Sequence, residues 1–414
     1  MTSSPEQEAF VWVWLPGRVE PVVAGRLSQQ GTQLVFNYGQ SYLQRDHAIA
    51  LYDKELPLKP GVLPLLPGLT MPGCIRDASP DAWGRRVIIN RMMGRSALVA
   101  DNADLSELSY LLESGSDRIG ALDFQRSATE YVPRLAGKAR LEELMESVSR
   151  VEQGVPLSPA LDQALNHGTS IGGARPKALI EADDVKYIAK FSSSTDITNV
   201  VKAEFVAMRM AALVGLDVAP VRLVNAGNRD VLLIKRFDRV WSGGGWQRKT
   251  MISALTLLGL DEMMARYASY EELAEIVRHR FASPRTTLHE LFGRIVFNIL
   301  CGNTDDHARN HAAFWDGQRL SLTPAYDICP QGRTGNEASQ AMLISGNNRM
   351  SRLTVCRDAA HQFQLNGEEA SAIIQHQINV ITAQWPVVCD EAELSSVERS
   401  LMWQRQFLNP FVFQ

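Results

Sequence analysis

The feature that most constrains this chain is a long apolar helical pattern that runs directly into a dense polar segment. From residue 288 to residue 299, apolar side chains recur at positions i, i+3, i+4, i+7, i+8 and i+11, which predicts a helix with one wide buried face. The segment GNTDDHARNHAAF, residues 302–314, follows almost at once. A solvated loop needs polar residues, but it does not need two aspartates, a histidine, an arginine and an asparagine between residues 305 and 310. The segment is therefore a candidate catalytic loop.

Length, charge and cysteine usage exclude several classes of protein. The 414 residues are 45% hydrophobic, which is enough for two or three domains with real cores. There are 42 basic and 46 acidic residues, a balance that argues against a general nucleic-acid binder, although a local basic patch stays possible. The five cysteines are dispersed without a CxxC pair, as in a reducing compartment, and predict neither a disulfide framework nor a zinc site.

The sequence gives no sign of a membrane segment. The first ten residues, MTSSPEQEAF, lack the basic and apolar parts of a leader, and no apolar run approaches the ~18 residues of a membrane span. We therefore expect a soluble, cytoplasmic protein that does not contact a membrane.

The N-terminal region is expected to be rich in short strands. The runs VWVWL, VVAGRLS, TQLVFNY and IALY are separated by turn residues. SPDAWGRRVIINRMMG then predicts a helix that runs toward Gly94, and Asp81 is better explained as its N-cap than as a catalytic group. A further, polar helix is expected in ARLEELMESVSRVEQG.

A glycine-rich turn and a lysine-bearing strand open the next region. In HGTSIGGARPKALI, Gly172 and Gly173 allow backbone amides to cradle phosphate oxygens, although paired glycines more often form an ordinary turn. In VKYIAKF, the alternation of a strand places Lys190 with Lys186 on one face. An ammonium deep in an apolar run needs a partner or a ligand, unless Lys190 reaches solvent from an edge strand.

The helical pattern that follows, NVVKAEFVAMRMAALVGL, carries a carboxylate on its apolar face. Val201, Phe205 and Met208 form the stripe, and Glu204 falls on the same face. A buried carboxylate is costly unless it is paired, and Lys190 on the preceding strand is the expected partner. A protein kinase fixes its nucleotide-binding lysine with a strand-to-helix pair of this kind.

The candidate catalytic loop matches a spacing found in kinases. Protein kinases separate a catalytic Asp and a metal-binding Asn by five positions, and Asp305 and Asn310 have this spacing whereas Asp306 does not. Arg309 is placed to neutralise charge on a transferring phosphoryl group. His307 is available as a donor in the site, but a structural role explains it at least as well.

A final aspartate completes the set. Asp327 ends the segment LSLTPAYD, where a kinase places its second metal ligand, although a turn residue before Pro330 is the simpler explanation when this segment is taken alone. The order of the features carries the argument: glycine turn, strand lysine, helix glutamate, Asp-x4-Asn, then Asp. Phosphoryl transfer requires positioning and charge neutralisation, and this ordered set supplies both.

With these residues, the chain resembles the HipA family, the serine/threonine kinase toxins of bacterial toxin–antitoxin pairs. TSIGGARPKALI is similar to the family's phosphate loop, VLLIKRFDR to its hinge strand, GNTDDHARN to its catalytic loop, LTPAYDI to its metal segment and SPDAWGRR to a motif of its N-terminal domain. The resemblance covers nearly the full length. It implies an α+β, protein-kinase-like bilobal fold with a small β-rich N-terminal domain at 1–150, an N-lobe-like domain at 151–238 and a mostly helical C-lobe at 239–414.

The resemblance also implies roles for individual residues. Asp305 is the expected catalytic base, Asn310 and Asp327 are the expected Mg²⁺ ligands, and Lys190 is the expected phosphate lysine. Ser170 lies where family members autophosphorylate, and an added charge of roughly −1.5 to −2 beside the ATP phosphates would switch the activity off. The residues expected to bind ATP are Gly172, Gly173, Ala174, Arg175, Pro176, Lys177, Lys190, Glu204, Lys235, Arg236, Phe237, His307, Ala308, Arg309, Asn310, Tyr326 and Asp327.

The cofactors and partners are likewise implied by the family. They are ATP and Mg²⁺, a helix-turn-helix antitoxin of the HipB type that would connect the chain to DNA only indirectly, and a protein substrate such as an aminoacyl-tRNA synthetase, whose modification stalls translation. Arg309 stands where many members carry lysine, and Lys235 stands where a hinge glutamate can occur. The segment QGRTGNEASQAMLISGNN, where a substrate-reading loop would lie, matches no particular target.

Two other functions stay open at this point. One is a catalytically silent corepressor that works with a DNA-binding antitoxin, and the intact set Lys190, Asp305, Asn310 and Asp327 counts against it. The other is a small-molecule kinase with the same core, and the N-terminal domain and the context of Ser170 count against it. Nucleotide turnover would exclude the first, and phosphorylation of a metabolite without toxicity would identify the second.

Overall fold

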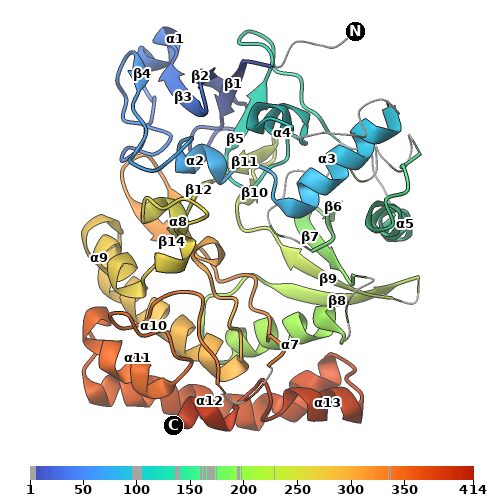
Figure 1. Cartoon of the computed structure of the whole chain (residues 1–414), viewed down its shortest axis with the longest axis vertical. Coiled ribbons are helices and arrows are strands. Elements are labelled where there is room, and N and C mark those ends of the chain that lie inside the picture. Colours follow the sequence, from blue (N-terminus) through green and yellow to red (C-terminus); the bar gives the residue numbers. More distant parts are fainter. Residues whose placement is uncertain are drawn as a thin grey trace. The chain divides into compact units, whose positions relative to one another are not determined.

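The computed structural model describes residues 6–95, 105–135, 140–158, 161, 165, 173, 175–193, 196, 198–227, 229–333, 335 and 337–414, with the backbone alone for 93–95. These residues group into two compact units (Figure 1). The first unit comprises Met1–Thr195, Val224–Ile252 and Trp315–Gly317, and the second comprises Asp196–Leu223, Ser253–Phe314 and Gln318–Gln414. The division into three domains that the sequence suggested stays a prediction.

The first unit begins with an antiparallel five-stranded sheet of strand order β4-β3-β2-β1-β5. Alternating apolar residues of its strands, among them Val11, Leu27, Phe36 and Phe124, are fully buried, as the period of two in the sequence requires. The elements of this region are β1 Glu8–Val13, β2 Val22–Gln30, β3 Gln33–Tyr38, α1 Gln40–Leu43, β4 Val62–Leu63, α2 Gly73–Arg76, α3 Ala82–Arg95, α4 Glu107–Glu113 and β5 Leu122–Gln125.

One expected strand is wrong. The run IALY forms no strand, and Tyr52 makes only an isolated bridge to Leu56. The buried backbone of this run is satisfied by tyrosine hydroxyls instead of by a neighbouring strand: the Tyr38 hydroxyl accepts from the Leu51 amide at 2.9 Å, and the Tyr42 hydroxyl donates to the Ile49 carbonyl at 2.8 Å. The apolar residues of this run therefore predicted its burial correctly, but they did not predict which groups form hydrogen bonds with its backbone.

The second sheet of the first unit has the order β6-β7-β9-β8, and the unit takes Val224–Ala226 of β8. Trp83 of α3 and Leu144 and Val148 of α5 pack with Phe191 and Leu233 of the sheet in one core, so both expected helices cover it (Figure 1). The remaining elements of this region are α5 Leu141–Glu152, β6 Lys177–Ala182, β7 Val185–Phe191, β8 Val221–Ala226, β9 Arg229–Lys235, β10 Arg239–Trp241, β11 Trp246–Arg248 and β12 Thr250–Ser253.

The second unit is mostly helical, as the sequence predicted. Helix α12 packs against both α7 and α10, and the apolar stripe from 288 to 299 is buried in the middle of α10 (Figure 1). No helix in the described part of the chain is long and apolar enough to cross a lipid bilayer. The elements are α7 Val200–Leu213, α8 Ala254–Leu257, α9 Tyr270–Arg280, α10 Pro284–Cys301, β13 Ala312–Trp315, β14 Leu320–Leu322, α11 Leu353–Ala359, α12 Gly367–Glu391, α13 Ser396–Met402 and 3₁₀ turns at Ala265–Tyr267, Ala308–Asn310, Ala360–Phe363 and Pro410–Phe413.

A buried ion network joins distant segments of the first unit. Asp117, between α4 and β5, accepts hydrogen bonds from Arg236 and Arg239, which follow β9, at 3.0 Å and 2.9 Å, and pairs with Lys186 of β7 at 2.5 Å. Asp238 accepts from Arg236 at 2.8 Å and from Arg239 at 2.9 Å. Burial raises the pKa of the Asp117 carboxyl, but the positive charges of Arg236, Arg239 and Lys186 outweigh burial and hold that pKa well below its usual range. This charge balance stabilises the folded first unit.

Replacing Asp117 by Asn should destabilise the first unit strongly. The change removes one of the two carboxylates that balance Arg236 and Arg239 in a desolvated site, which costs about 3–5 kcal/mol. Urea unfolding of the Asp117→Asn variant measures this loss, with exposed Asp46→Asn as the matched control at about 0.5 kcal/mol or less. Equal stabilities of the two variants would contradict the role of the network.

The network also sets a pH dependence. The pKa values of Asp117 and Asp238 are lowered by the arginines, despite burial, so the unfolded chain binds more protons at these carboxyls than the folded protein does. Their contribution to stability is present above the unfolded pKa of ~3.9 and is lost as the pH falls below it. We expect the unfolding free energy of the wild type to drop more steeply below pH 4 than that of Asp117→Asn, and parallel curves would argue against the assignment.

Candidate active site

The candidate catalytic loop leaves helix α10 through a glycine that no other residue can replace without strain. Gly302 has φ +75°, and a Cβ there would lie 2.8 Å from the carbonyl oxygen of Gln406. The C-terminal segment lies next to this turn, and the Leu408 amide donates a hydrogen bond to the Leu300 carbonyl at 2.7 Å. The start of the loop is therefore fixed by a left-handed backbone and by a close backbone contact.

Hydrogen bonds within the loop fix Asp305 relative to Asn310. The carbonyl oxygen of Asp305 accepts from the His307 amide at 2.9 Å and from Nδ2 of Asn310 at 3.0 Å. Because Nδ2 is used in this way, Oδ1 of Asn310 is the atom left to face a cation. The Tyr326 hydroxyl donates to the Arg309 carbonyl at 2.7 Å, which ties the segment that contains Asp327 to the loop.

Asp305 and Asp327, the predicted base and metal ligand, are close enough to interact electrostatically. Partial burial raises the pKa of the Asp305 carboxyl, His307 lowers it, and the negative charges of Asp327 and Asp306 raise it, with a net upward shift. Asp327 itself holds a left-handed backbone at φ +59°, a conformation that aspartate adopts more readily than most residues. The Asp305 side chain is exposed and available to a substrate.

The neighbouring Asp306 has the opposite environment. It is buried, accepts a hydrogen bond from the Tyr270 hydroxyl and pairs with Nε2 of His311 at 2.7 Å. Burial raises the pKa of Asp306, but the interactions with His311 and Tyr270 outweigh it and lower that pKa. The sequence had indicated no role for Asp306, Tyr270 or His311. The second Asp and second His of the loop were visible, but nothing in the sequence pointed to a tyrosine at the start of α9.

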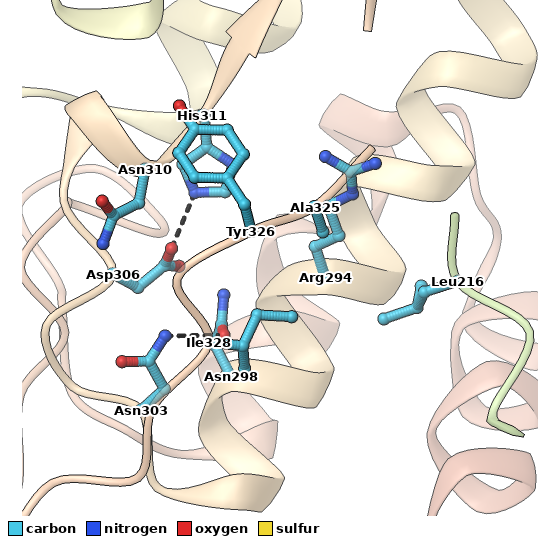
Figure 2. A pocket seen from close by; sticks show the side chains of 10 residues that line it. All are labelled: Leu216, Arg294, Asn298, Asn303, Asp306, Asn310, His311, Ala325, Tyr326 and Ile328. Atoms are coloured by element: carbon cyan, nitrogen blue, oxygen red, sulfur yellow. Dashed lines mark hydrogen bonds and ion pairs between the residues drawn. The ribbon is translucent and has the colours of Figure 1, made fainter. Parts of the chain in front are cut away.

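A small pocket lies on the inner side of the loop (Figure 2). In Figure 2, Asp306 points toward His311, and Asn303 faces Asn298, to which its Nδ2 donates at 3.0 Å. The lining includes Asp306 and Asn310 but neither Asp305 nor Asp327. This pocket therefore belongs to the polar support of the loop and is not the place where a substrate would meet the predicted base.

The predicted phosphate-binding residues lie in the first unit. Lys177 of β6 and Lys190 of β7 stand directly opposite each other, and both are buried. The prediction of a buried carboxylate on α7 is confirmed, because the Glu204 side chain is only 2% exposed. Glu204 belongs to the second unit, so its pairing with Lys190 stays a prediction. Ser170, Gly172 and Ala174 lie outside the described residues.

The predicted hinge residues, Lys235 to Phe237, include an arginine that belongs to the buried ion network. The Arg236 side chain binds Asp117, Asp238 and the Arg118 carbonyl, and the Arg236 amide donates to the Lys186 carbonyl at 2.8 Å. A nucleotide base could therefore use only the carbonyl of Arg236. Lys235 is exposed and Phe237 is half-buried. The ATP contacts proposed for these three residues stay predictions.

The other predicted loop residues have defined positions. The Arg309 guanidinium pairs with Glu262 at 2.6 Å, so in this structure it is held by a carboxylate of the same unit. Ala308 is buried, and Nδ1 of His307 is buried with no hydrogen-bond partner among the described residues. Arg175 and Pro176 precede β6 in the first unit, next to Lys177.

The residues that would hold a cation fit Mg²⁺ chemistry. No group of three or more His, Cys, Asp or Glu side chains among the described residues is arranged as a metal site. Mg²⁺ in phosphoryl-transfer sites is usually held by one or two carboxylates together with substrate phosphates and water. Asp327, with the free amide oxygen of Asn310 on the adjoining loop, is an oxygen donor set of that kind.

Replacing Asp306 by Ala should destabilise the second unit by about 3–5 kcal/mol, because it leaves the Tyr270 hydroxyl and His311 buried without their acceptor. The Asp306→Asn variant keeps an acceptor oxygen, so its unfolding free energy should fall by less than that of Asp306→Ala. Denaturant unfolding measures both, and Asp358→Ala at an exposed position of the same unit is the control. A loss for Asp306→Ala no larger than that for Asp358→Ala would show that the buried network contributes little.

Comparison with known proteins places these features in one family. The family model described as the HipA-like C-terminal domain matches residues 169–385, and the HipA N-terminal domain model matches residues 13–125. The chain is 26% identical over 344 residues to the putative kinase Y4mE of Sinorhizobium fredii, which covers 76% of each protein. It is 24% identical over 183 residues to the serine/threonine-protein kinase toxin HipA of Shewanella oneidensis, which covers 38% of this chain and 42% of that protein.

A solved structure gives the same result for the fold. The HipA chain of Shewanella oneidensis MR-1, determined in a complex of HipA, HipB and operator DNA, matches with a TM-score of 0.69 at 18% identity and covers 96% of this chain and 95% of that chain. The α+β fold expected from the sequence is thereby confirmed. Since the C-terminal model alone matches more than half of the residues, the chain belongs to the HipA family.

Proposed function

We propose that this protein is an ATP- and Mg²⁺-dependent serine/threonine protein kinase that acts as the toxin of a toxin–antitoxin pair. The observation that carries the proposal is the geometry of one loop, in which Asp305 and Asn310 are joined by a hydrogen bond and Asp327 lies within electrostatic reach of Asp305. The relatives named as kinases support the same reaction class.

The proposed chemistry assigns one task to each group. Asp305 would accept the proton of a serine or threonine hydroxyl as the hydroxyl oxygen attacks the γ-phosphorus of ATP and ADP leaves. Its raised pKa makes it a stronger base than an ordinary aspartate. Mg²⁺, held by Asp327 and Asn310, would neutralise charge on the phosphates. Lys177 and Lys190 would bind phosphate oxygens from the first unit.

Three parts of the proposal rest on the likeness to the family. Autophosphorylation of Ser170 would be the off-switch, because a phosphate beside the ATP phosphates repels them. A HipB-type antitoxin would bind the protein, as HipB does in the complex of the Shewanella relative, and would supply the contact with DNA. The protein substrate would be a component of translation such as an aminoacyl-tRNA synthetase.

The decisive variant is Asp305→Asn. It keeps the shape of the side chain and removes the base, so we expect phosphoryl transfer to fall by roughly 10²–10⁴-fold while ATP binding persists. Dephosphorylated protein is incubated with Mg²⁺ and ATP, and intact mass with peptide mapping follows the phosphate on Ser170. Asp358→Asn, exposed and outside the site, is the matched control.

Each outcome of this experiment selects one function. Phosphate on Ser170 in the wild type and in Asp358→Asn, but not in Asp305→Asn, supports a protein kinase. Transfer to a metabolite pool but to no protein would favour a small-molecule kinase. A wild type that binds no ATP would leave the silent corepressor as the function, and the kinase proposal would fail.

A further inference from the structure

We propose that Asp81 and Trp83, at the start of α3, are positioning residues of the nucleotide site, and that they hold the backbone at Gly173 in place for phosphate binding. The inference rests on the proposed function, because it assigns a task to residues outside the kinase motifs. It also revises the role that the sequence suggested for Asp81, an N-cap with no part in the site.

The contacts bracket the short segment between the glycine and β6. A carboxylate oxygen of Asp81 accepts the hydrogen bond of the Gly173 amide. Nε1 of Trp83 donates to the Lys177 carbonyl at 3.0 Å, and the Trp83 amide makes a long contact to the Gly173 carbonyl at 3.4 Å. One turn of α3 thus binds both ends of the backbone that leads into β6.

Gly173 has a conformation that needs this support. Its φ is +102°, and a Cβ at this position would lie 2.2 Å from Nζ of Lys177. The ammonium of Lys177 therefore rests against the glycine, directly opposite Lys190 on the next strand. Two positive charges therefore lie at this corner of the sheet, and such charges attract a polyanion such as the ATP phosphates.

The start of α3 is rigid enough to act as a support. Trp83 is fully buried and packs in one core with Ala178 of β6, Ala189 of β7 and Leu233 of β9. Arg85, one turn further along, forms a two-point ion pair with Glu107 at 2.6 Å and 2.8 Å. A helix anchored in this way cannot follow the glycine backbone if that backbone moves.

A carboxylate beside a phosphate site has two opposite consequences. Repulsion between the carboxylate and the phosphates would weaken ATP binding. A Gly173 backbone that is fixed before ATP arrives would strengthen binding, because less conformational entropy is then lost on binding. The Gly173 amide is already hydrogen-bonded to Asp81, and Lys177 stands beside the glycine as a counter-charge. We therefore assign Asp81 the second effect.

The test uses the full chain and a non-hydrolysable ATP analogue with Mg²⁺. We expect Asp81→Ala to weaken binding of the analogue by roughly tenfold, the loss of one charge-assisted hydrogen bond. Asp81→Asn should bind nearly as the wild type does, because its amide oxygen can still accept from Gly173. In the kinase assay, Asp81→Ala should raise KM for ATP by a similar factor and leave kcat at saturating ATP unchanged.

Glu107→Gln is the matched control for the stability of α3. It weakens the anchoring pair with Arg85 without touching Gly173 or Lys177, so it should lower thermal stability and leave analogue binding unchanged. Equal losses of binding in Glu107→Gln and Asp81→Ala would assign the effect to α3 in general and overturn the inference. Tighter binding in both Asp81 variants would show repulsion and overturn it as well.

A second measurement separates this inference from the proposed function. Hydrogen exchange at the Gly173 amide, without nucleotide, should be roughly tenfold or more faster in Asp81→Ala than in the wild type, and close to the wild type in Asp81→Asn. Unchanged exchange would sink the inference even if the protein is a kinase. Faster exchange in the Asp81→Ala variant of a protein that binds no ATP would confirm that Asp81 holds the Gly173 backbone. It would also show that this contact has no role in nucleotide binding.

Discussion

The buried carboxylate of Asp117 is the interaction on which the first unit depends. It neutralises cations from two places in the chain, Lys186 of β7 and the arginines that follow β9. A buried ion is stable only when an opposite charge compensates its loss of hydration. Each of these segments therefore stabilises the fold more when the segments that carry the opposite charges are also in place. The position of β7, the strand that carries Lys190, is therefore tied to the segment between α4 and β5 through the Lys186–Asp117 ion pair.

The same network explains why one sequence motif has two meanings. RFDR resembles the family's hinge strand, and that resemblance suggested contacts between Arg236 and ATP. In the structure both arginines and the aspartate of this motif fill a charge-balanced core position, in which Asp238 also accepts from the Gly120 amide at 2.8 Å. A motif can be specific to a family because it holds the site in place, without any side chain of the motif touching the ligand.

Local patterns in the sequence predicted local structure well. The apolar stripe of α10, the strand β7 and the helix α3 each depend on neighbouring residues, and each element forms where the sequence predicted it. Interactions between distant residues could not be predicted in this way. The IALY run is held by hydroxyls of Tyr38 and Tyr42, and Asp306 is held by Tyr270, 36 residues away. Spacing in a sequence contains no information on such partners.

The two adjacent aspartates of the loop show how environment, more than residue type, divides the work of a site. Asp306 is buried among donors that lower its pKa, so it stays ionised and holds the loop. Asp305 reaches solvent, and its pKa is raised by desolvation from the surrounding protein atoms and by the neighbouring carboxylates. Carboxyls whose environments push their pKa values apart are typical of sites that use one as a fixed charge and the other in proton transfer. The exposed aspartate can change its protonation during a reaction without loss of structure, because the structural charge lies on its neighbour.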